Sequence, residues 1–449
     1  MTQTDDSLPP GAAPSRRRRT GWRWLVIGLL LVLAMLAASV LSLAPVVPLP
    51  RAPDAPTATA ARDVLQQITG DDTQRGDLVR FTLAQRELDG LAVLASEALS
   101  PLRVQARVRS VPPAQLKASS KSVRSIPPAG ELVIDMSREL GWGMWINATA
   151  QVRPTEPQRG TGLPDIAVTL GRLPVPQWVT HWALERVWAQ TQSDATRPIS
   201  LEQALKSFAI APPQARLALV NPGRGTALWG LTRAGAATPD PRMLSDAYCA
   251  IADTGKANLA VLVRRAAALK IPSGVTPQEH NRVLLTAIAM RAVPEFRIKL
   301  AGAAWKVAAS CDASPERLTL AGREDLSAHW ALSAALAATV GSQVAQSMGT
   351  WKELADSIEG GSGFSFVDLS ADRSGERFAV AAVNPQLARA VHARLVAITE
   401  DQMLPKEALA RPEGLDQAAF ERNYTAVNSP EYTRALRTID RLLDNVGVP

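Results

Sequence analysis

The chain has 449 residues, which is too long for one ordinary domain and favours two or three. Hydrophobic residues make up 46% and charged residues 20%, which excludes a wholly disordered chain, a collagen-like fibre and a polytopic transporter. Two cysteines exclude a disulfide scaffold and any site with four thiolate ligands. The net charge of +7 is partly concentrated in residues 1–44, and no basic stripe interleaved with aromatic residues follows, so we expect no nucleic-acid partner.

The N-terminus has the pattern of a membrane anchor. Residues 1–23 form a basic tail, and residues 24–44 form an uncharged apolar run that is long enough to cross the ~30 Å hydrocarbon layer. Trp22 and Trp24 stand where interfacial aromatic residues occur, and the arginines hold the N-terminus in the cytoplasm. We therefore predict a signal-anchor transmembrane helix at 24–44 in a bacterial inner membrane, with the bulk of the chain in the periplasm. A cleaved signal peptide is the alternative.

Alternating apolar and polar residues predict a sheet domain over residues 61–195, after a semi-stiff spacer rich in proline and alanine at 45–60. In residues 103–109, for example, the three apolar side chains share one face, as in a half-buried strand. Helical spacing before and after these segments predicts helices packed on an antiparallel sheet. The other predicted strands lie at 132–134, 144–150 and 166–170, and the predicted helices lie at 83–99 and from 174 onward.

The C-terminal half predicts helices. Apolar residues recur with helical spacing from 196 to 400, beginning with Leu201–Phe208, and residues 401–449 predict an arm that wraps this helical domain. Cys249 and Cys311 suit a disulfide in an oxidising compartment, and two unpaired buried thiols are the alternative. The predicted fold class is α+β, with an N-terminal transmembrane helix, an antiparallel sheet domain with packed helices, and a mainly α-helical C-terminal domain.

The segment 322–375 holds the most unusual group of ionisable residues. The run from Leu326 to Trp351 has no charge and is rich in Ala, Ser and Thr, which predicts a thin helix that neighbours can approach closely. A second membrane span is the alternative for this run. Residues three or four apart share one helix face, so three such pairs predict that one imidazole and up to five carboxylates converge. The pairs are Asp325 with His329, Glu353 with Asp356, and Asp368 with Asp372.

Carboxylates that lie this close either raise one another's pKa or bind a cation. A divalent metal ion is one solution, and neighbouring basic side chains as counter-ions are another. A carboxylate acting as general base, with His329 moving the proton, would make the group catalytic. A purely structural network also fits, because Asp325 and Asp368 suit the first turns of helices. The side chains that we predict as metal ligands are His329, Glu353, Asp356 and Asp372.

Several motifs of this segment follow one another at suitable spacing. An acidic residue stands four positions before a His-Trp pair, and three motifs follow: Gly-x-x-Lys-Glu-Leu-x-Asp-Ser, Gly-Ser-Gly-Phe-Ser and Asp-x-x-x-Asp-x-x-Gly. They begin at Asp325, Gly349, Gly361 and Asp368. In these motifs residues 322–375 resemble the YfiM family of small enterobacterial lipoproteins, although a lipobox cysteine is absent. The whole chain also looks like larger proteobacterial proteins, so the resemblance implies an envelope protein but transfers no activity.

Two functions fit the sequence. The favoured one is a binding or assembly factor of the cell envelope, attached to the inner membrane through 24–44 and with an envelope protein or lipid as partner. The alternative is a metal-dependent hydrolase that acts on an envelope polymer or lipid through the residues of 322–375. Neither a P-loop, a Gly-x-Ser-x-Gly elbow nor a His-Glu-x-x-His motif is present, so no sequence motif decides whether the chain is an enzyme.

Overall fold

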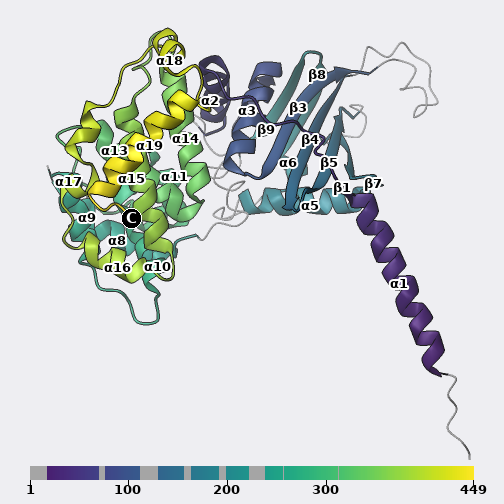
Figure 1. Cartoon of the computed structure of the whole chain (residues 1–449), viewed down its shortest axis with the longest axis horizontal. Coiled ribbons are helices and arrows are strands. Elements are labelled where there is room, and N and C mark those ends of the chain that lie inside the picture. Colours follow the sequence, from purple (N-terminus) through teal and green to yellow (C-terminus); the bar gives the residue numbers. More distant parts are fainter. Residues whose placement is uncertain are drawn as a thin grey trace, which may run out of the picture.

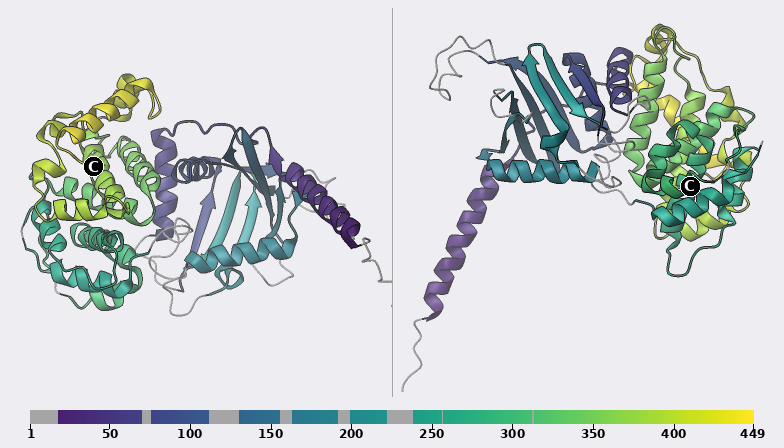
Figure 2. Two further views of the ribbon diagram at one scale, coloured as in Figure 1. Left: turned by 60° about the horizontal axis from the view of Figure 1, so that its bottom comes forward. Right: turned by 180° about the vertical axis from the view of Figure 1, so that it is seen from behind.

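The computed structural model describes residues 18–69, 76–111, 130–155, 163–191, 199–221, 238–255, 257–311 and 313–449. The fold is α+β, with a sheet region next to a helical region (Figure 1). The first seventeen residues of the predicted basic tail lie outside the described residues. A single helix, α1 (Arg18–Val40), extends from one end of the sheet region, away from the helical region (Figures 1 and 2).

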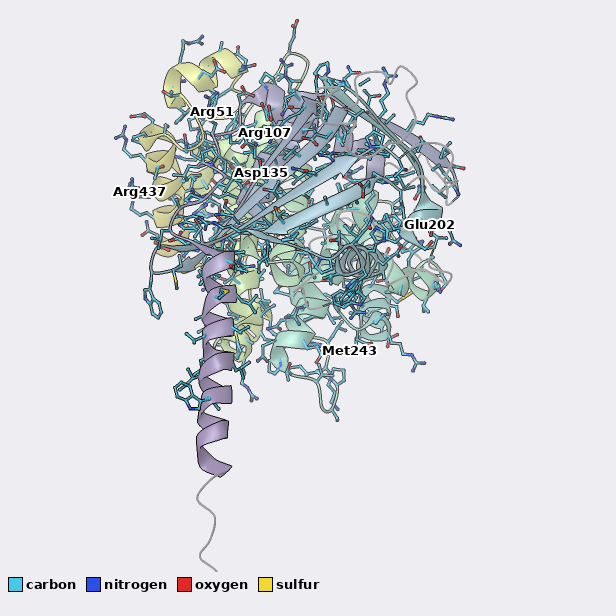
Figure 3. The ribbon with its side chains drawn as sticks, turned by 90° about the vertical axis from the view of Figure 1, so that its right-hand side faces the viewer. Arg51, Arg107, Asp135, Glu202, Met243 and Arg437 are labelled. Atoms are coloured by element: carbon cyan, nitrogen blue, oxygen red, sulfur yellow. A yellow bond between two sulfur atoms is a disulfide. The ribbon has the colours of Figure 1, made fainter. Side chains whose placement is uncertain are left out.

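The main sheet is antiparallel, and each of the four predicted strands lies within one of its strands. It follows the order β3-β4-β5-β6-β7, and β1 pairs with β5. Arg107 of β3 and Asp135 of β4 form an ion pair across the sheet at 2.5 Å (Figure 3). The strands are β1 (Leu41–Ser42), β3 (Leu102–Ser110), β4 (Gly130–Gly141), β5 (Met144–Arg153), β6 (Asp165–Leu170) and β7 (Leu173–Pro174).

The apolar face of β3 is covered by α3 (Gln85–Ala98), in the region of the helix predicted over 83–99. Leu88 and Ala92 of this helix pack with Ala106, Leu132 and Val152 of the sheet in a small core. The alternation of β3 therefore has the expected cause, since one face of the strand is buried under a helix. A second helix, α5 (Gln177–Thr191), packs on β6.

A second, three-stranded sheet was not predicted. Its order is β2-β9-β8, formed by β2 (Leu78–Leu83), β9 (Gln214–Val220) and β8 (Leu205–Ala211). The helix predicted over Leu201–Phe208 is wrong beyond Ala204, because α6 (Leu201–Ala204) is only one turn long and β8 follows it. Phe208 and Ile210 stand two residues apart and both pack on the small core, so a period of two outweighs the helical spacing here. The sheets therefore continue to Val220.

The predicted transmembrane helix at 24–44 is wrong. Among the helices of the described ranges, none has both the length and the apolar character that crossing a membrane requires, which also removes the second span considered within Leu326–Trp351. The predicted run is divided, because the helix ends at Val40 and Leu41 and Ser42 pair with Ile146 and Trp145 of β5. The helical part, 24–40, is about 25 Å long at 1.5 Å per residue, shorter than a ~30 Å hydrocarbon layer.

The cellular location predicted from that span has no support either. The inner-membrane anchor, the cytoplasmic N-terminus and the periplasmic position of the bulk of the chain all depended on a helix crossing the bilayer at 24–44, and this finding overturns them. The segment 45–60 also packs against the body of the protein. Val47 is buried, its backbone N–H donates to Ser137, and residues from Ala55 onward form α2 (Ala55–Thr69), which lies against α3 and α14.

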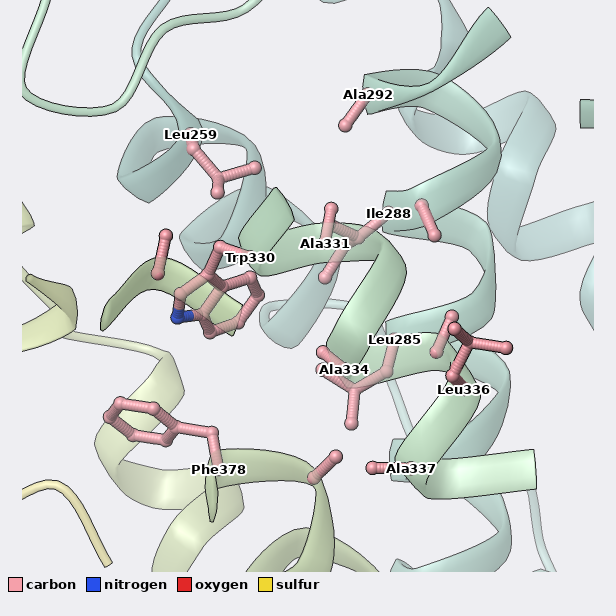
Figure 4. Close-up of a cluster of buried hydrophobic side chains, with 14 of the residues drawn as sticks. Leu259, Leu285, Ile288, Ala292, Trp330, Ala331, Ala334, Leu336, Ala337 and Phe378 are labelled. Atoms are coloured by element: carbon pink, nitrogen blue, oxygen red, sulfur yellow. The ribbon is translucent and has the colours of Figure 1, made fainter. Parts of the chain in front are cut away.

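The helical region is built around three long helices, α10 (Pro277–Ala292), α13 (Glu324–Thr339) and α15 (Phe366–Val383). Their contact surfaces consist of alanine, leucine and a few large residues, with Trp330 against Phe378 at a ring distance of 5.9 Å (Figure 4). The other helices here are α8 (Pro241–Ala252), α9 (Leu259–Ala267), α11 (Arg297–Ala301), α12 (Trp305–Ala308), α14 (Ser342–Asp356), α16 (Ala388–Leu395), α17 (Glu400–Met403), α18 (Gln417–Tyr424) and α19 (Pro430–Asn445), with 3₁₀ turns at Pro294–Phe296, Gly302–Ala304 and Lys406–Ala410.

Two features fasten the outer parts of the helical region. Cys249 of α8 and Cys311, which follows α12, form a disulfide with their Cα atoms 5.4 Å apart. The segment 401–449 lies over α15, where Arg373 of α15 makes hydrogen bonds of 2.7–2.9 Å to Asp440 of α19. The C-terminal helices thereby close one side of the bundle.

Candidate metal centre

The candidate site lies where α13, α14 and α15 meet, and close helix packing brings it together. Gly375 makes the approach of α13 and α15 possible, because a Cβ at this position would lie 2.1 Å from the backbone oxygen of Trp330. Trp330 donates from Nε1 to Ser374 Oγ at 3.1 Å in the same interface. His329 precedes Trp330 and Asp372 lies one turn before Gly375, so both face each other at the same level of the two helices.

His329 lies between two carboxylates. Its Nδ1 is 3.1 Å from Asp372 Oδ1, and its Nε2 is 3.2 Å from Asp368 Oδ2. Ser333, one turn further along α13, donates to the same Asp372 oxygen at 2.6 Å. The imidazole is buried with 9% of its side chain exposed, so the ring orientation is fixed at both nitrogens.

Glu353 of α14 is fully buried and, together with His329, Asp368 and Asp372, forms what we call the inner group. Its Oε1 lies 3.9 Å from His329 Nε2 and 2.9 Å from Lys352 Nζ. Its Oε2 accepts the backbone N–H of Ser365 at 2.9 Å, just before α15 begins. The Ser365 hydroxyl accepts in turn from the backbone N–H of Asp368 at 3.0 Å, so one residue positions both carboxylates.

His329, Glu353 and Asp368 have the spacing of metal ligands. Within the described ranges, His329, Glu353 and Asp368 each offer one ligand atom, and the three atoms lie within 4.8 Å of one another. Ligands at about 2.0–2.2 Å from one ion lie roughly 3.0–3.6 Å apart. His329 Nε2 lies 3.2 Å from Asp368 Oδ2 and 3.9 Å from Glu353 Oε1, and all three ligand atoms lie within 4.8 Å, so the group has to contract around an ion.

Buried charge shifts the pKa values of all three groups. Burial opposes the imidazolium of His329, but Asp372 and Asp368 outweigh it and raise the pKa of His329 to about 10. Burial raises the pKa of Glu353 to about 7, although Lys352 acts in the opposite direction. For Asp368, burial is outweighed by His329 and Lys352, and its pKa is lowered. A proton on His329 therefore balances the surrounding carboxylates in the metal-free protein.

The inner group opens on one side to a pocket of about 730 Å³, the outer pocket, which is lined by His329, Asp368 and Lys352. Charged residues surround its mouth, and acidic side chains outnumber basic ones among them. Lys352 is 45% exposed and contacts Glu353 Oε1 and Asp356 Oδ2, both at 2.9 Å. The charged residues of the rim are Glu295, Arg317, Arg323, Glu324, Asp325 and Glu413.

The structure brings together four of the six residues predicted to converge, namely His329, Glu353, Asp368 and Asp372. The other two lie at the margin. Asp325 binds Arg323 at 2.5 Å, and Asp356 binds Arg62 of α2 at 3.0 Å as well as Lys352. Of the predicted metal ligands, Asp372 sits behind the imidazole at Nδ1 and Asp356 faces outward, whereas Asp368 joins His329 and Glu353.

Three further residues of the site were not predicted. Ser333 stands four residues after His329, so the helical spacing that paired His329 with Asp325 could have indicated it. Ser365 stands three residues before Asp368, the spacing of a helix cap, but its backbone bond to Glu353 depends on the path of the loop before α15 and has no local signal. Arg62 has no local signal, since 294 residues separate it from Asp356.

Comparison of the chain with protein-family models, with curated proteins and with solved structures gives no match. The similarity of residues 322–375 to the YfiM family therefore stays a prediction. The geometry of the site is therefore the only basis for a proposed function.

Proposed function

We propose that the protein is a divalent-metal-dependent hydrolase whose ion is bound by His329 Nε2, Glu353 Oε1 and Asp368 Oδ2. One observation carries this proposal: three ligand atoms lie within 4.8 Å of one another, and two of the three residues, His329 and Asp368, line the outer pocket. A histidine with two carboxylates suits Zn²⁺ or Mn²⁺. Three protein ligands leave a coordination position for water, as in catalytic zinc sites.

Asp372 has the position of the supporting carboxylate in such a centre. Metal-binding histidines commonly donate their second ring N–H to a carboxylate, which fixes the tautomer and makes the other nitrogen a better ligand. His329 Nδ1 meets Asp372 Oδ1 at 3.1 Å, which leaves Nε2 for the ion. Ser333 holds the same oxygen and keeps Asp372 in place.

Lys352 binds two carboxylates, so it can release one of them to the ion and stay bound to the other. Metal binding requires its ammonium to leave Glu353, while Asp356, held by Arg62, can retain it. A bound divalent ion polarises a carbonyl group and lowers the pKa of a bound water. Because acidic residues predominate around the outer pocket, we infer that uncharged esters or amides are better substrates than phosphoesters.

The test is metal binding to protein first stripped with EDTA. Titration with Zn²⁺ and Mn²⁺ in a calorimeter is expected to give one site per chain, and His329→Ala is expected to abolish it. His181→Ala is the matched control, because this histidine lies exposed on α5. Hydrolysis of p-nitrophenyl acetate by the loaded protein then tests the reaction. A stripped protein that binds neither ion would contradict the proposal and leave a structural ion network at this position.

A further inference from the structure

Two histidines that the metal centre does not use meet where α16 packs against α10 (Figure 1). His280 lies near the start of α10 and His392 lies in α16, and their ring centroids are 5.4 Å apart. His280 is 4% exposed, and His392 is half-buried. The contact between the two helices therefore holds two copies of the side chain that ordinarily titrates between pH 5 and 8.

Asn281 fixes the protonation of the His392 ring. Its Nδ2 donates to the backbone oxygens of Ala382 and Ala388 at 2.9 and 3.0 Å, so its Oδ1 is an acceptor. His392 Nδ1 lies 2.8 Å from this Oδ1 and must therefore carry a proton. Because Asn281 is fully buried and bonds to both Ala382 and Ala388, it also ties the end of α15 to the start of α16.

The buried His280 ring has room for one proton only. One ring nitrogen donates to the backbone oxygen of Leu269, and within the described ranges the buried Nε2 has no hydrogen-bond partner. A second proton would place a charged N–H at Nε2 without an acceptor, which is costly in a buried site. Burial, followed by the charge of His392, lowers the pKa of His280, and burial also lowers the pKa of His392. Both imidazoles are therefore neutral at neutral pH in the folded chain.

Within the described ranges, no carboxylate compensates a positive charge on either ring. Glu279 is the nearest carboxylate in the sequence, and it acts on Arg282 instead. The last turns of α13 and α15, helices that also pack on α10, carry no charged residue. Charged residues of the adjoining segments are Arg264, Lys270, Glu279, Arg282, Arg389 and Arg394. None of these residues acts on the pKa of either imidazole, whereas His392 acts on His280.

We infer that His280 and His392 form an acid-sensitive latch, and that proton uptake by the two imidazoles separates α16 from α10. Two imidazolium rings at this distance repel each other, and a charged His280 needs water at Nε2, which requires α16 to move. The chain continues from α16 into α17, where Met403 accepts a hydrogen bond from Ser374 of α15 at its backbone oxygen. Opening would therefore also loosen a contact behind α15. The latch goes beyond the proposed hydrolase, because no metal ion takes part in it.

The experiment measures hydrogen exchange of the full chain in EDTA by mass spectrometry at pH 7.5 and 5.0, with rates corrected for the intrinsic exchange rate at each pH. A histidine that is neutral in the fold and has a pKa of about 6.5 once released favours opening about tenfold or more over this range. We therefore expect the protection of α16 to fall about tenfold or more at pH 5.0. The helix α8, which also packs on α10, is the internal reference and should keep its protection.

His280→Gln/His392→Gln is expected to remove this pH dependence. A glutamine amide can donate to Leu269 and to Asn281 as the imidazoles do, but it does not titrate. His181→Gln, at an exposed position of α5, is the matched control and should behave as the wild type does. His392→Gln alone changes only the half-buried ring and should reduce the pH dependence in part, which keeps the test decisive if the double variant does not fold.

Three results would overturn the latch: equal protection of α16 at both pH values in the wild type, an unchanged pH dependence in the folded double variant, or an unchanged pH dependence in His392→Gln. The metal centre cannot produce the expected loss. The pKa of His329 is raised to about 10, so this ring keeps its proton throughout the range. The pKa of Glu353 is raised to about 7, so its proton uptake stabilises the fold as pH falls, which is the opposite sign. Failure of the latch therefore leaves the proposed hydrolase untouched, and absence of metal binding leaves the latch untouched.

Discussion

At the scale of single residues, His329 is the group on which the metal centre depends. The protonated imidazole lies between Asp372 at Nδ1 and Asp368 at Nε2. Its positive charge neutralises part of their negative charge, as a metal ion at Nε2 would. The same arrangement that makes Nε2 a ligand therefore also makes its proton hard to remove. Competition between this proton and the ion sets the pH at which the site fills.

Metal affinity should rise with pH. The pKa of His329 is raised to about 10, so binding an ion at neutral pH releases one proton from Nε2. We expect the apparent affinity for Zn²⁺ to increase about tenfold per pH unit between pH 7 and 9. Titrations in buffers of different ionisation enthalpy measure the released proton directly. An affinity that is constant over this range would show that His329 is not a ligand.

The metal-free protein should lose stability as pH rises. A histidine whose folded pKa exceeds its unfolded value of about 6.5 stabilises the fold fully below that value and no longer does so above about 10. The pKa of Glu353 is raised to about 7, so its contribution to stability also falls as pH rises, and it is lost at a lower pH than that of His329. We expect the free energy of unfolding to fall by a few kcal/mol between pH 6 and 10. Urea unfolding of His329→Gln, compared with wild type, should show a flatter profile.

Lys352 should compete with the metal ion. Its ammonium lies 2.9 Å from Glu353 Oε1 and 4.0 Å from Asp368 Oδ2, so it occupies part of the field that would bind the ion. We expect Lys352→Met to raise the affinity for Zn²⁺ about tenfold and to lower the stability of the metal-free protein. Lys306→Met, at an exposed position, is the control for loss of one positive charge. Weaker binding by Lys352→Met would instead show that the lysine supports the bound ion.

At the scale of elements, the site depends on how closely α13 and α15 approach. Ala331, Ala334 and Ala371 have small side chains and are fully buried in this interface, which lets residues of both helices meet across it. Ridges of small side chains reduce the distance between helix axes. The alanine content of the run from Leu326 to Trp351 is thus the cause of the short distance between His329 and Asp372.

Gly375→Ala tests this directly. A Cβ at Gly375 would lie 2.1 Å from the backbone oxygen of Trp330, so the helices would have to separate. We expect a loss of about 1–3 kcal/mol in the free energy of unfolding, together with weaker metal binding. Gly28→Ala in α1 has no atom within 4 Å of the new Cβ and should be neutral or slightly stabilising. Equal stability of both variants in urea would contradict this account of the packing.

At the scale of the whole molecule, the sheet and helical regions are joined by partly buried polar contacts. Trp351 of α14 donates to Glu97 of α3 at 2.6 Å, and Arg62 of α2 binds Asp356 of α14 at 3.0 Å. Both contacts end on α14, the helix that carries Glu353. A shift between the two regions would therefore move one side of the metal centre.

The disulfide stabilises the outer part of the helical region. It joins residues 62 positions apart, and a crosslink of this length is typically worth about 2–4 kcal/mol. We expect Cys249→Ala/Cys311→Ala to unfold at lower urea concentration by that amount, with metal binding unchanged because the bond is remote from α14. Wild type reduced with dithiothreitol should behave as the variant does. An oxidised wild type no more stable than the variant would rule out this role.

The local pattern was informative where one face of an element is buried. Residues 103–109 alternate because α3 covers one side of β3, and that covering is a local consequence of the helix that precedes the strand. Leu201–Phe208 misled because helical and strand spacing coincide over so few residues, and only pairing with β9 selects the strand. The apolar run at 24–44 was also misinterpreted as one helix, because Leu41 and Ser42 pair with β5 instead of continuing the helix.

The sequence by itself determined that one histidine and several acids lie on the facing sides of helices, because helical spacing and alanine content are local properties. It could not determine which acid joins His329 and Glu353. Asp368 does so and Asp356 does not, because Ser365 positions Asp368 while Arg62, nearly three hundred residues away, holds Asp356 outward. The hollow of about 630 Å³ between the two regions likewise exists only in the tertiary structure, since its walls come from segments that meet only when the sheet region packs against α14 and α15.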